Sequence, residues 1–348
     1  MDSQLKCDFY FGDFVGTPIK KIDYNELTGF KKELKNIYIP HTGFEWQKGA
    51  WQLIFKPYKH YIITGTPGSL SNWVLLLFAK LLNKKIYAWS HGMKGNNTPA
   101  GRIIEVNFYR LCYKVLLYGD YAKNIMENAG FSENKLIPIY NSLDYNNQVS
   151  IRKNLKPNNI YLNHFGNSNP VLIYIGRIQK RKKLELLISA VNDLNKEKKP
   201  CNLVIVGPDE ENNDIPKLIE NLNLNDKVWM YGPCYDETKS AELLFNAHAC
   251  VTPGPVGLTA LHALTYGCPV ISNNDFDTQM PEYESVTPKE TGSFFELDNL
   301  ESLKEHINYW ISKDLSQRID VRKYAYKIID EKYNPHYQIN ILKNLMQK

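Results

Sequence analysis

The sequence predicts an α/β protein with two domains, each built on a parallel sheet covered by helices. The chain has 348 residues, which is long for one α/β domain and comfortable for two. Both halves alternate short apolar runs with helical segments, the order expected of parallel strands joined by helices. In the second half four of these apolar runs end in glycine and are each followed by a helix, as in a doubly wound sheet.

The first half contains four apolar runs that predict strands, with helices expected after two of them. The strands are expected over residues 60–65, 84–92 and 113–119 and, as a strand with an exit loop, over 135–144; the helices are expected over 72–82 and 120–129. Residues 7–13 have the character of an interior strand, so we expect the first βα unit of this domain to be missing. Residues 145–169 are rich in Asn and lack apolar periodicity, which predicts a linker.

The second half shows the pattern more clearly. Strands are expected over residues 171–176, 202–207, 227–232, 249–254 and 268–273, and helices over 184–194, 215–222, 236–247 and 257–266. The two domains are therefore expected to cover residues 1–165 and 166–333.

Composition excludes several classes of protein and favours the cytoplasm. No apolar run reaches the roughly 18 residues of a membrane-spanning helix. The first residues lack a basic segment followed by an apolar core, so no signal peptide is expected. The six cysteines form no CxxC pair and read as free thiols in a reducing compartment. No HExxH motif is present, so no metal site is expected.

The net positive charge lies in the first half, because it has fewer acidic residues. Residues 1–165 carry 21 Lys and Arg against 12 Asp and Glu, whereas residues 166–348 carry 21 against 25. A basic domain suggests an anionic partner, such as a membrane surface or a lipid phosphate. The alternative is a solvated lysine-rich surface. Nucleic acid is not expected, because no basic run is interleaved with aromatic residues in a recognisable module.

The strongest chemical signal is the segment GRIQKRKK, residues 176–183, directly after a predicted buried strand. A loop at the carboxyl end of such a strand lies at the ligand-binding edge of the sheet. Its five cations are Arg177, Lys180, Arg181, Lys182 and Lys183. Fixed cations there would stabilise the charge that develops on a departing diphosphate. The alternative, a solvated basic helix start, places cations where the helix dipole disfavours them.

A second signal lies in residues 251–271, where a strand, a Pro/Gly turn and a helix follow one another. The helix is expected to open at Gly257, and the amides of Gly257, Leu258 and Thr259 would have no partners within the helix. Such amides bind anions, and glycine lets the backbone approach a phosphate closely.

Together these segments resemble the retaining glycosyltransferases of family 4, which have the GT-B fold, of the type that builds bacterial surface polysaccharides. The likeness covers roughly residues 170–312 and rests on Gly-Arg at 176–177, Lys182, GCPVI at 267–271, MPEYE at 280–284 and TGSFFEL at 291–297. It implies two Rossmann-like domains facing across a cleft, with residues 334–348 packing back on the first. It also implies a nucleotide-diphospho-sugar as substrate and no cofactor or metal.

The resemblance further implies which residues hold the donor. Arg177 and Lys182 would bind the diphosphate, and Gly176, Val256, Gly257, Leu258 and Thr259 would line the donor site. Glu282 resembles the family's loop acid near the donor. His91, in the segment WSHG, resembles the family's strand-end histidine and would contact the sugar or the acceptor, the alternative being an ordinary loop histidine.

The sequence departs from the family at two glutamates, whose places are taken by Gly254 and His262. His262 could hold the donor ribose through an imidazole nitrogen or could be a satisfied core histidine. Gly254 has no side chain to contact the sugar. The expected activity is transfer of a sugar to a polysaccharide or lipid-linked saccharide, with retention and at the inner membrane face. The alternatives are a sugar-nucleotide epimerase and a non-catalytic nucleotide-sugar-binding protein.

Overall fold

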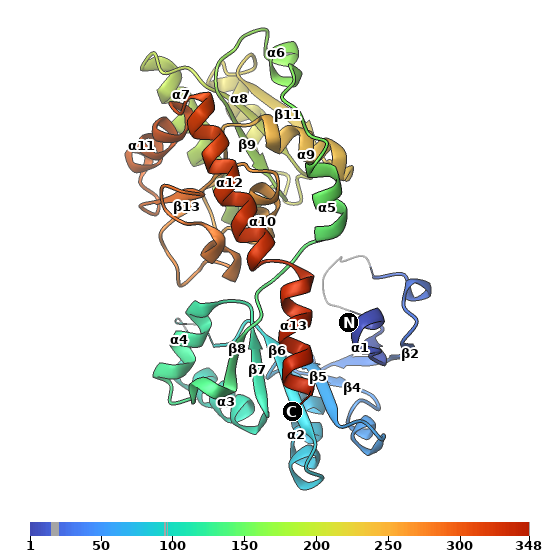
Figure 1. Ribbon diagram of the computed structural model, residues 1–348. Helices are drawn as coiled ribbons and strands as arrows, with labels where there is room; N and C mark the ends of the chain where they lie inside the picture. The colour runs from blue at the N-terminus through green and yellow to red at the C-terminus, as the bar shows by residue number, and fades with distance from the viewer. Residues whose placement is uncertain (15–20, 94, 96, 348) are drawn as a thin grey trace. The chain divides into compact units, whose positions relative to one another are not determined.

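The computed structural model describes residues 1–14, 21–93, 95 and 97–347 (Figure 1). The chain divides into two compact units. Unit 1 comprises Met1–Tyr140 and His336–Lys348, and unit 2 comprises Asn141–Pro335. No helix of the described residues is both long enough and apolar enough to cross a membrane.

Unit 1 is built on a four-stranded parallel sheet with the strand order β5-β6-β7-β8. These strands are β5 (His60–Thr64), β6 (Lys85–Ser90), β7 (Lys114–Leu117) and β8 (Leu136–Pro138). Helices α2 (Leu70–Leu81), α3 (Pro99–Leu111) and α4 (Asp120–Asn128) connect them. The 3-10 helices of this unit are η1 (Tyr24–Glu26), η2 (Trp51–Phe55) and η3 (Glu133–Lys135). All four strands of this sheet, together with α2 and α4, lie where the sequence predicts them.

Two small sheets and a short helix precede this core. The helix is α1 (Asp2–Leu5). One sheet is the parallel pair β1 (Phe9–Gly12) and β2 (Phe30–Leu34), and the other is the antiparallel pair β3 (Asn36–Tyr38) and β4 (Glu45–Gln47). The segment expected to be an interior strand therefore forms β1, which pairs with β2 in a sheet separate from the four-stranded one.

The last helix of the chain, α13 (Pro335–Met346), completes unit 1. Leu342 is fully buried in a cluster with Tyr87 and Leu116 of the sheet. Gln338 Nε2 donates to the Tyr140 carbonyl at 2.8 Å. The C-terminal segment is thus held by apolar contacts and by a buried hydrogen bond to the residue at which the chain leaves unit 1.

Unit 2 is built on a six-stranded, fully parallel sheet. Its strands are β9 (Val171–Ile175), β10 (Asn202–Val206), β11 (Val228–Gly232), β12 (Ala249–Thr252), β13 (Val270–Asn273) and β14 (Gly292–Phe295). Its helices are α5 (Tyr145–Arg152), α6 (Ile160–Phe165), α7 (Leu184–Lys196), α8 (Ile215–Asn221), α9 (Glu237–Asn246), α10 (Leu258–Thr265), α11 (Leu300–Ile311) and α12 (Leu315–Glu331), with 3-10 helices η4 (Lys180–Lys182) and η5 (Pro281–Ser285). All five strands and four helices predicted in residues 171–273 are present.

Residues 145–169 differ from the expected linker, because they contain α5 and α6 and belong to unit 2. Tertiary contacts hold them there. Tyr161 is buried and its hydroxyl donates to the Leu243 carbonyl at 2.6 Å. Arg152 forms an ion pair with Asp330 of α12 at 2.8 Å. These contacts lie far apart in the sequence, which explains why local periodicity does not predict the two helices.

The strand order of unit 2 is β11-β10-β9-β12-β13-β14. In chain order this is 3-2-1-4-5-6, the doubly wound arrangement, and the order reverses between β9 and β12. Successive connections leave these two neighbouring strands in opposite directions, which opens a crevice beyond their carboxyl ends. In doubly wound sheets ligands bind in such a crevice, so the ends of β9 and β12 are the candidate site.

Candidate functional site

Two loops lie together at the carboxyl ends of β9 and β12. One is residues 176–183, which we call the basic loop, and the other is residues 253–257, which we call the proline-glycine loop. The Gly254 amide donates to the Lys182 carbonyl at 3.0 Å. Both loops were singled out from the sequence, and the reversal of strand order brings them into direct contact.

Gly254 packs directly against the backbone of the basic loop. A Cβ atom at this position would lie 2.0 Å from the Arg181 carbonyl oxygen and 2.7 Å from Lys182 Cα. Only glycine fits against backbone at such distances. The first glutamate of the resembled family is thus replaced by a residue that lets the basic loop pack directly on its neighbour.

Lys182 is the cation that turns inward. Its Nζ donates a hydrogen bond to the Pro255 carbonyl in the proline-glycine loop. Burial, followed by repulsion from Arg181 and Arg177, lowers the pKa of Lys182 to about 8. An ammonium held in a partly buried place beside two other cations is poorly solvated, and an anion would relieve that cost.

The other cations of the basic loop lie nearer the surface. Arg177 is half exposed and sits 3.5 Å from Glu210. Lys183 pairs with Asp298 at 2.5 Å. The Arg181 Nε donates to Gln179 at 2.9 Å. Arg177 directly follows Gly176, whose φ of 146° lies in the region that favours glycine. Among the five cations, Lys182 is the one positioned to contact a ligand in the crevice, and Arg177 lies at the edge of that crevice.

The start of α10 faces the same region. Gly257 is its N-cap residue and provides no side chain to satisfy the first amides. Thr259 Oγ1 donates to the Ile175 carbonyl at 3.1 Å, which ties the helix start to the end of β9 beside Gly176. The neighbouring Val256 is fully buried, and its amide donates to Gln279 at 2.7 Å. Leu258 is 44% exposed.

Glu282 in η5 adds a buried carboxylate to this region. Its side chain is 2% exposed, and Oε1 accepts from Asn141 Nδ2 at 2.8 Å. Oε2 is buried and has no hydrogen-bond partner among the described residues. It lies 3.9 Å from the position that a Cβ of Gly257 would occupy. An unpaired buried oxygen costs free energy until a donor reaches it, so this atom is suited to accept from a bound molecule.

His262, one turn further along α10, is paired with a carboxylate that sequence reasoning missed. Its Nε2 lies 3.1 Å from Glu237 Oε1. The same oxygen accepts from the Tyr266 hydroxyl at 2.6 Å and from Gln148 Nε2 at 2.8 Å. Burial raises the pKa of Glu237, but the hydrogen bonds from His262, Tyr266 and Gln148 outweigh it and hold the pKa at about 2.

Glu237 could not be singled out from the sequence because it resembles a helix-capping residue. It follows Asp236, whose side chain accepts from the amides of Thr238 and Lys239 and caps α9. An acidic residue in the first turn of a helix is ordinary. Only the folded chain reveals that this carboxylate meets a histidine of another helix.

His91 belongs to unit 1, whereas the other predicted site residues belong to unit 2. It follows β6 at the carboxyl edge of the four-stranded sheet, and its ring lies 4.8 Å from that of Tyr118. The preceding Ser90 is buried and its hydroxyl accepts from the Gly92 amide at 3.1 Å, which shapes the loop. The structure thus places His91 at the edge where ligands of parallel sheets bind.

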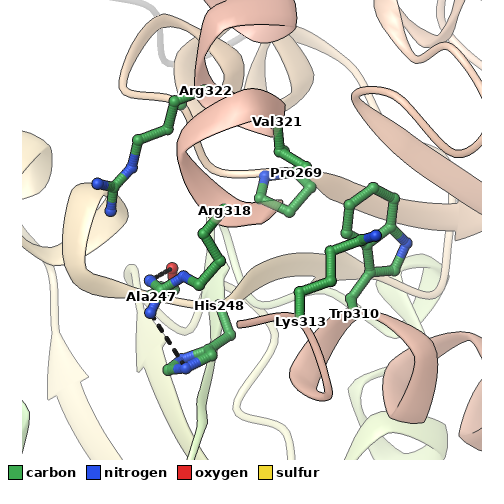
Figure 2. Close-up of a pocket in the computed structure, with 9 residues that line it drawn as sticks. Ala247, His248, Pro269, Trp310, Lys313, Arg318, Val321 and Arg322 are labelled. Atoms are coloured by element: carbon green, nitrogen blue, oxygen red, sulfur yellow. Dashed lines mark hydrogen bonds between the residues drawn. The ribbon is translucent and has the colours of Figure 1, made fainter. Parts of the chain in front are cut away.

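Unit 2 also has a cavity at the opposite, amino edge of its sheet, of about 10 Å³, room for one water molecule (Figure 2). Arg318 of α12 donates to the Ala247 carbonyl at 2.9 Å and lies 3.2 Å from His248 Nε2. Burial, followed by repulsion from Arg318 and Arg322, lowers the pKa of His248 to about 3. These arginines bind carbonyls at the end of α9, so the cavity belongs to the packing of α12.

Structures of known glycosyltransferases share this architecture. The chain is similar to the lipopolysaccharide outer core galactosyltransferase WaaB, with a TM-score of 0.69 and 15% identity over 98% of this chain and 99% of that one. It is similar to a glycosyltransferase from Rickettsia africae, with a TM-score of 0.68 and 19% identity over 91% and 83% of the two chains. For HepE from Anabaena in complex with UDP, the TM-score is 0.67, with 17% identity over 86% and 81%. The fold is GT-B, as the sequence predicts.

Sequence comparison finds a family model that matches most of unit 2. Residues 162–328 match the model of the family described as glycosyl transferases group 1. A protein from Klebsiella pneumoniae, described as an uncharacterized 41.2 kDa protein in the cps region, is 24% identical over 228 residues. The aligned part is 65% of this chain and spans 55% of that relative's length. The residues that match the family model lie within unit 2 and include its whole six-stranded sheet.

Proposed function

We propose that this protein transfers a sugar from a nucleotide-diphospho-sugar to a polysaccharide or lipid-linked saccharide, with retention of the anomeric configuration. The observation that carries the proposal is the contact between the basic loop and the proline-glycine loop at the switch point of unit 2. It joins Lys182 to the start of α10 through the Gly254–Lys182 hydrogen bond. A cation and helix amides beside one crevice match the charge of a diphosphate.

The reaction breaks the bond between the sugar and the diphosphate through an oxocarbenium-like state. Negative charge accumulates on the departing diphosphate, and Lys182 and Arg177 stabilise it. The low pKa of Lys182 favours this role, because its poorly solvated ammonium gains most when the phosphate gains charge. The proposal requires neither a metal nor a cofactor.

The remaining residues position the donor. The amides at Gly257, Leu258 and Thr259 contact phosphate or sugar, and Gly176 and Val256 line the base of the donor site. Glu282 Oε2 accepts from a sugar hydroxyl, because it is buried and unpaired among the described residues. The His262–Glu237 pair holds the ribose. His91 of unit 1 contacts the sugar or the acceptor.

Three comparisons support a nucleotide-sugar donor and a surface saccharide as acceptor. HepE from Anabaena has been solved with UDP-glucose, and WaaB is named a lipopolysaccharide outer core galactosyltransferase. The relative from Klebsiella pneumoniae comes from a cps region. The net positive charge of residues 1–165 agrees with an acceptor held at the anionic inner face of a membrane.

A survey of nucleotide-sugars by thermal shift, followed by a transfer assay, tests the proposal. A ligand that binds only the native state raises the melting temperature, so the survey identifies the donor. Transfer from that donor to a saccharide acceptor would support the proposal. Isomerisation of the donor would indicate an epimerase instead, and binding with neither transfer nor hydrolysis would indicate a non-catalytic binding protein.

A further inference from the structure

Unit 1 exposes a group of large apolar side chains on neighbouring helices. They are Phe55 of η2 and Leu77, Leu81 and Leu82 at the C-terminal end of α2, and they are 60%, 53%, 80% and 44% exposed. We call this group the α2 ridge. Figure 1 shows α2 in cyan, at the lower end of unit 1 in that view. A contiguous apolar group of this kind marks an interaction surface more often than scattered single residues do.

The ridge is a distinct face of a well-anchored helix. Leu75, Leu76 and Ala79 of α2 are buried in the core of unit 1. Leu77 and Leu81 are four residues apart and therefore share a different face. α2 thus has apolar residues both toward the core and toward solvent, whereas an ordinary surface helix is polar on its outer side.

Aromatic packing fixes η2 against α2. The ring of Phe55 lies 5.7 Å from that of Phe78, and Trp51 lies 5.7 Å from the same ring. Phe78 and Trp51 are partly buried against the core. The ridge is therefore presented on a rigid support, so burying it costs little ordering of the backbone.

The charge around the ridge is mostly positive. Residues 46–104 contain eight Lys and Arg and no Asp or Glu. Lys56, Lys59 and Lys80 are exposed, and they lie next to Phe55 and Leu81 in the sequence or close to them. Lys84 turns back and donates to the Lys56 and Tyr58 carbonyls. The carboxylate of Asp8, outside this segment, lies close enough to Lys56 to feel its charge, because its pKa is lowered by the hydrogen bond from Tyr58 and further by attraction to Lys31 and Lys56. The lysines beside the ridge outnumber this one carboxylate.

We propose that the α2 ridge binds the surface of an anionic lipid bilayer, with the leucines and Phe55 at the boundary of the acyl chains and the lysines among the headgroups. Apolar residues flanked by an excess of lysine match such a surface, where apolar burial and attraction to anionic lipids act together. The lysine stems can also lie along the apolar boundary with their ammonium groups in water. This inference deepens the proposed action at a membrane face and depends on none of the donor-binding residues.

Vesicle flotation with the full-length protein tests the proposal. We expect binding to vesicles of phosphatidylglycerol and phosphatidylcholine, little binding to phosphatidylcholine alone, and release by salt. Leu77→Gln with Leu81→Gln should weaken binding about tenfold or more. The combined change of Lys56, Lys59 and Lys80 to Gln should also weaken it, and at low salt by more than at high salt.

Leu162→Gln is the matched control, because Leu162 is a leucine of α6 in unit 2 that is 45% exposed. It should bind vesicles as the unchanged protein does. All variants should keep the thermal shift caused by UDP, which separates failure of this inference from failure of the proposed reaction. Equal vesicle binding by the double leucine variant, or no binding to anionic vesicles, would overturn the inference. So would loss of self-association in the leucine variant without an effect on vesicles, because the ridge would then be a protein interface.

Discussion

Glu237 at the start of α9 lies 3.1 Å from Nε2 of His262 in α10, and the two side chains are 32% and 18% exposed. The resembled family has a glutamate at the position of His262, so this chain supplies a carboxylate to the same region from another helix. The pKa of about 2 keeps Glu237 ionised at every physiological pH. Glu237 therefore supplies the negative charge that a glutamate at position 262 would carry, and it lies within hydrogen-bond distance of His262.

Glu237→Gln should weaken UDP binding about tenfold, the value of one charge-assisted contact, while leaving the protein folded. The amide keeps an oxygen that can accept from Tyr266 and Gln148 but removes the charge. Isothermal titration calorimetry measures the change. Glu220→Gln, at an exposed position on α8, is the matched control and should leave the affinity unaltered. Unchanged affinity in Glu237→Gln would remove this residue from the donor site.

Glu237→Ala should in addition lower the free energy of unfolding by about 1–3 kcal/mol, because Tyr266 and His262 lose their acceptor. Tyr266 is fully buried, so its hydroxyl finds no water in exchange. Urea unfolding of the variant, compared with Glu220→Ala, measures the difference. A loss no larger than in the control would mean that the cluster adds nothing to stability.

Donor binding should depend on pH through Lys182. With its pKa lowered to about 8, Lys182 loses its proton in the free protein as the pH rises above that value. A bound diphosphate needs the ammonium, so the dissociation constant for UDP should rise by up to about tenfold per pH unit above about pH 8, with proton uptake on binding. Lys182→Arg should bind UDP without this dependence, because arginine stays charged.

Calorimetry in buffers of different ionisation enthalpy measures the proton uptake directly. Lys217→Arg, on the exposed side of α8, provides the control and should keep the pH dependence. A dissociation constant that stays level through pH 8 in the unchanged protein would show that Lys182 does not meet the diphosphate.

Arg177→Ala and Lys182→Ala should each lower donor turnover at least about tenfold, as expected for the loss of a charge-assisted contact to phosphate. Arg177 is half exposed and its pair with Glu210 is long, so stability should change little. Lys217→Ala is the control. Normal kinetics in both variants would refute the assignment of the basic loop.

The parts of the structure that the sequence predicts are those fixed by local pattern. The first four strands of unit 2 are continuous apolar runs ended by glycine, and Gly176 adopts a conformation that favours glycine. The parts it misses depend on partners far along the chain. α5 and α6 are held by Tyr161 and Arg152 through residues of α9 and α12, and Glu237 gains its role from α10. No periodicity within a segment contains that information.

His248 should make unit 2 sensitive to acid. Its pKa is lowered to about 3 in the folded protein, so it stays neutral there while the unfolded chain takes up a proton below its usual pKa of about 6.5. Stability should therefore fall as the pH drops from about 6.5 toward 3, on the order of 2 kcal/mol by pH 5. His248→Asn should lose less over this range than the unchanged protein or His41→Asn, an exposed control. An equal loss of stability in the unchanged protein and both variants would contradict the lowered pKa of His248.

Gly254 determines whether the missing glutamate can be restored. Gly254→Glu should fail to add a sugar contact and should instead separate the two loops, because its Cβ would overlap the Arg181 carbonyl. Gly254→Ala isolates that overlap and should cost about 3 kcal/mol of unfolding free energy, together with most of the affinity for UDP, because Lys182 moves with the loop. The matched control is Gly232→Ala, where φ is 83° and no atom lies within 4 Å of the added methyl group. That variant carries only the backbone penalty of about 1–2 kcal/mol and should keep UDP affinity. Equal UDP affinity in Gly254→Ala and Gly232→Ala would show that the contact between the loops is not what builds the donor site.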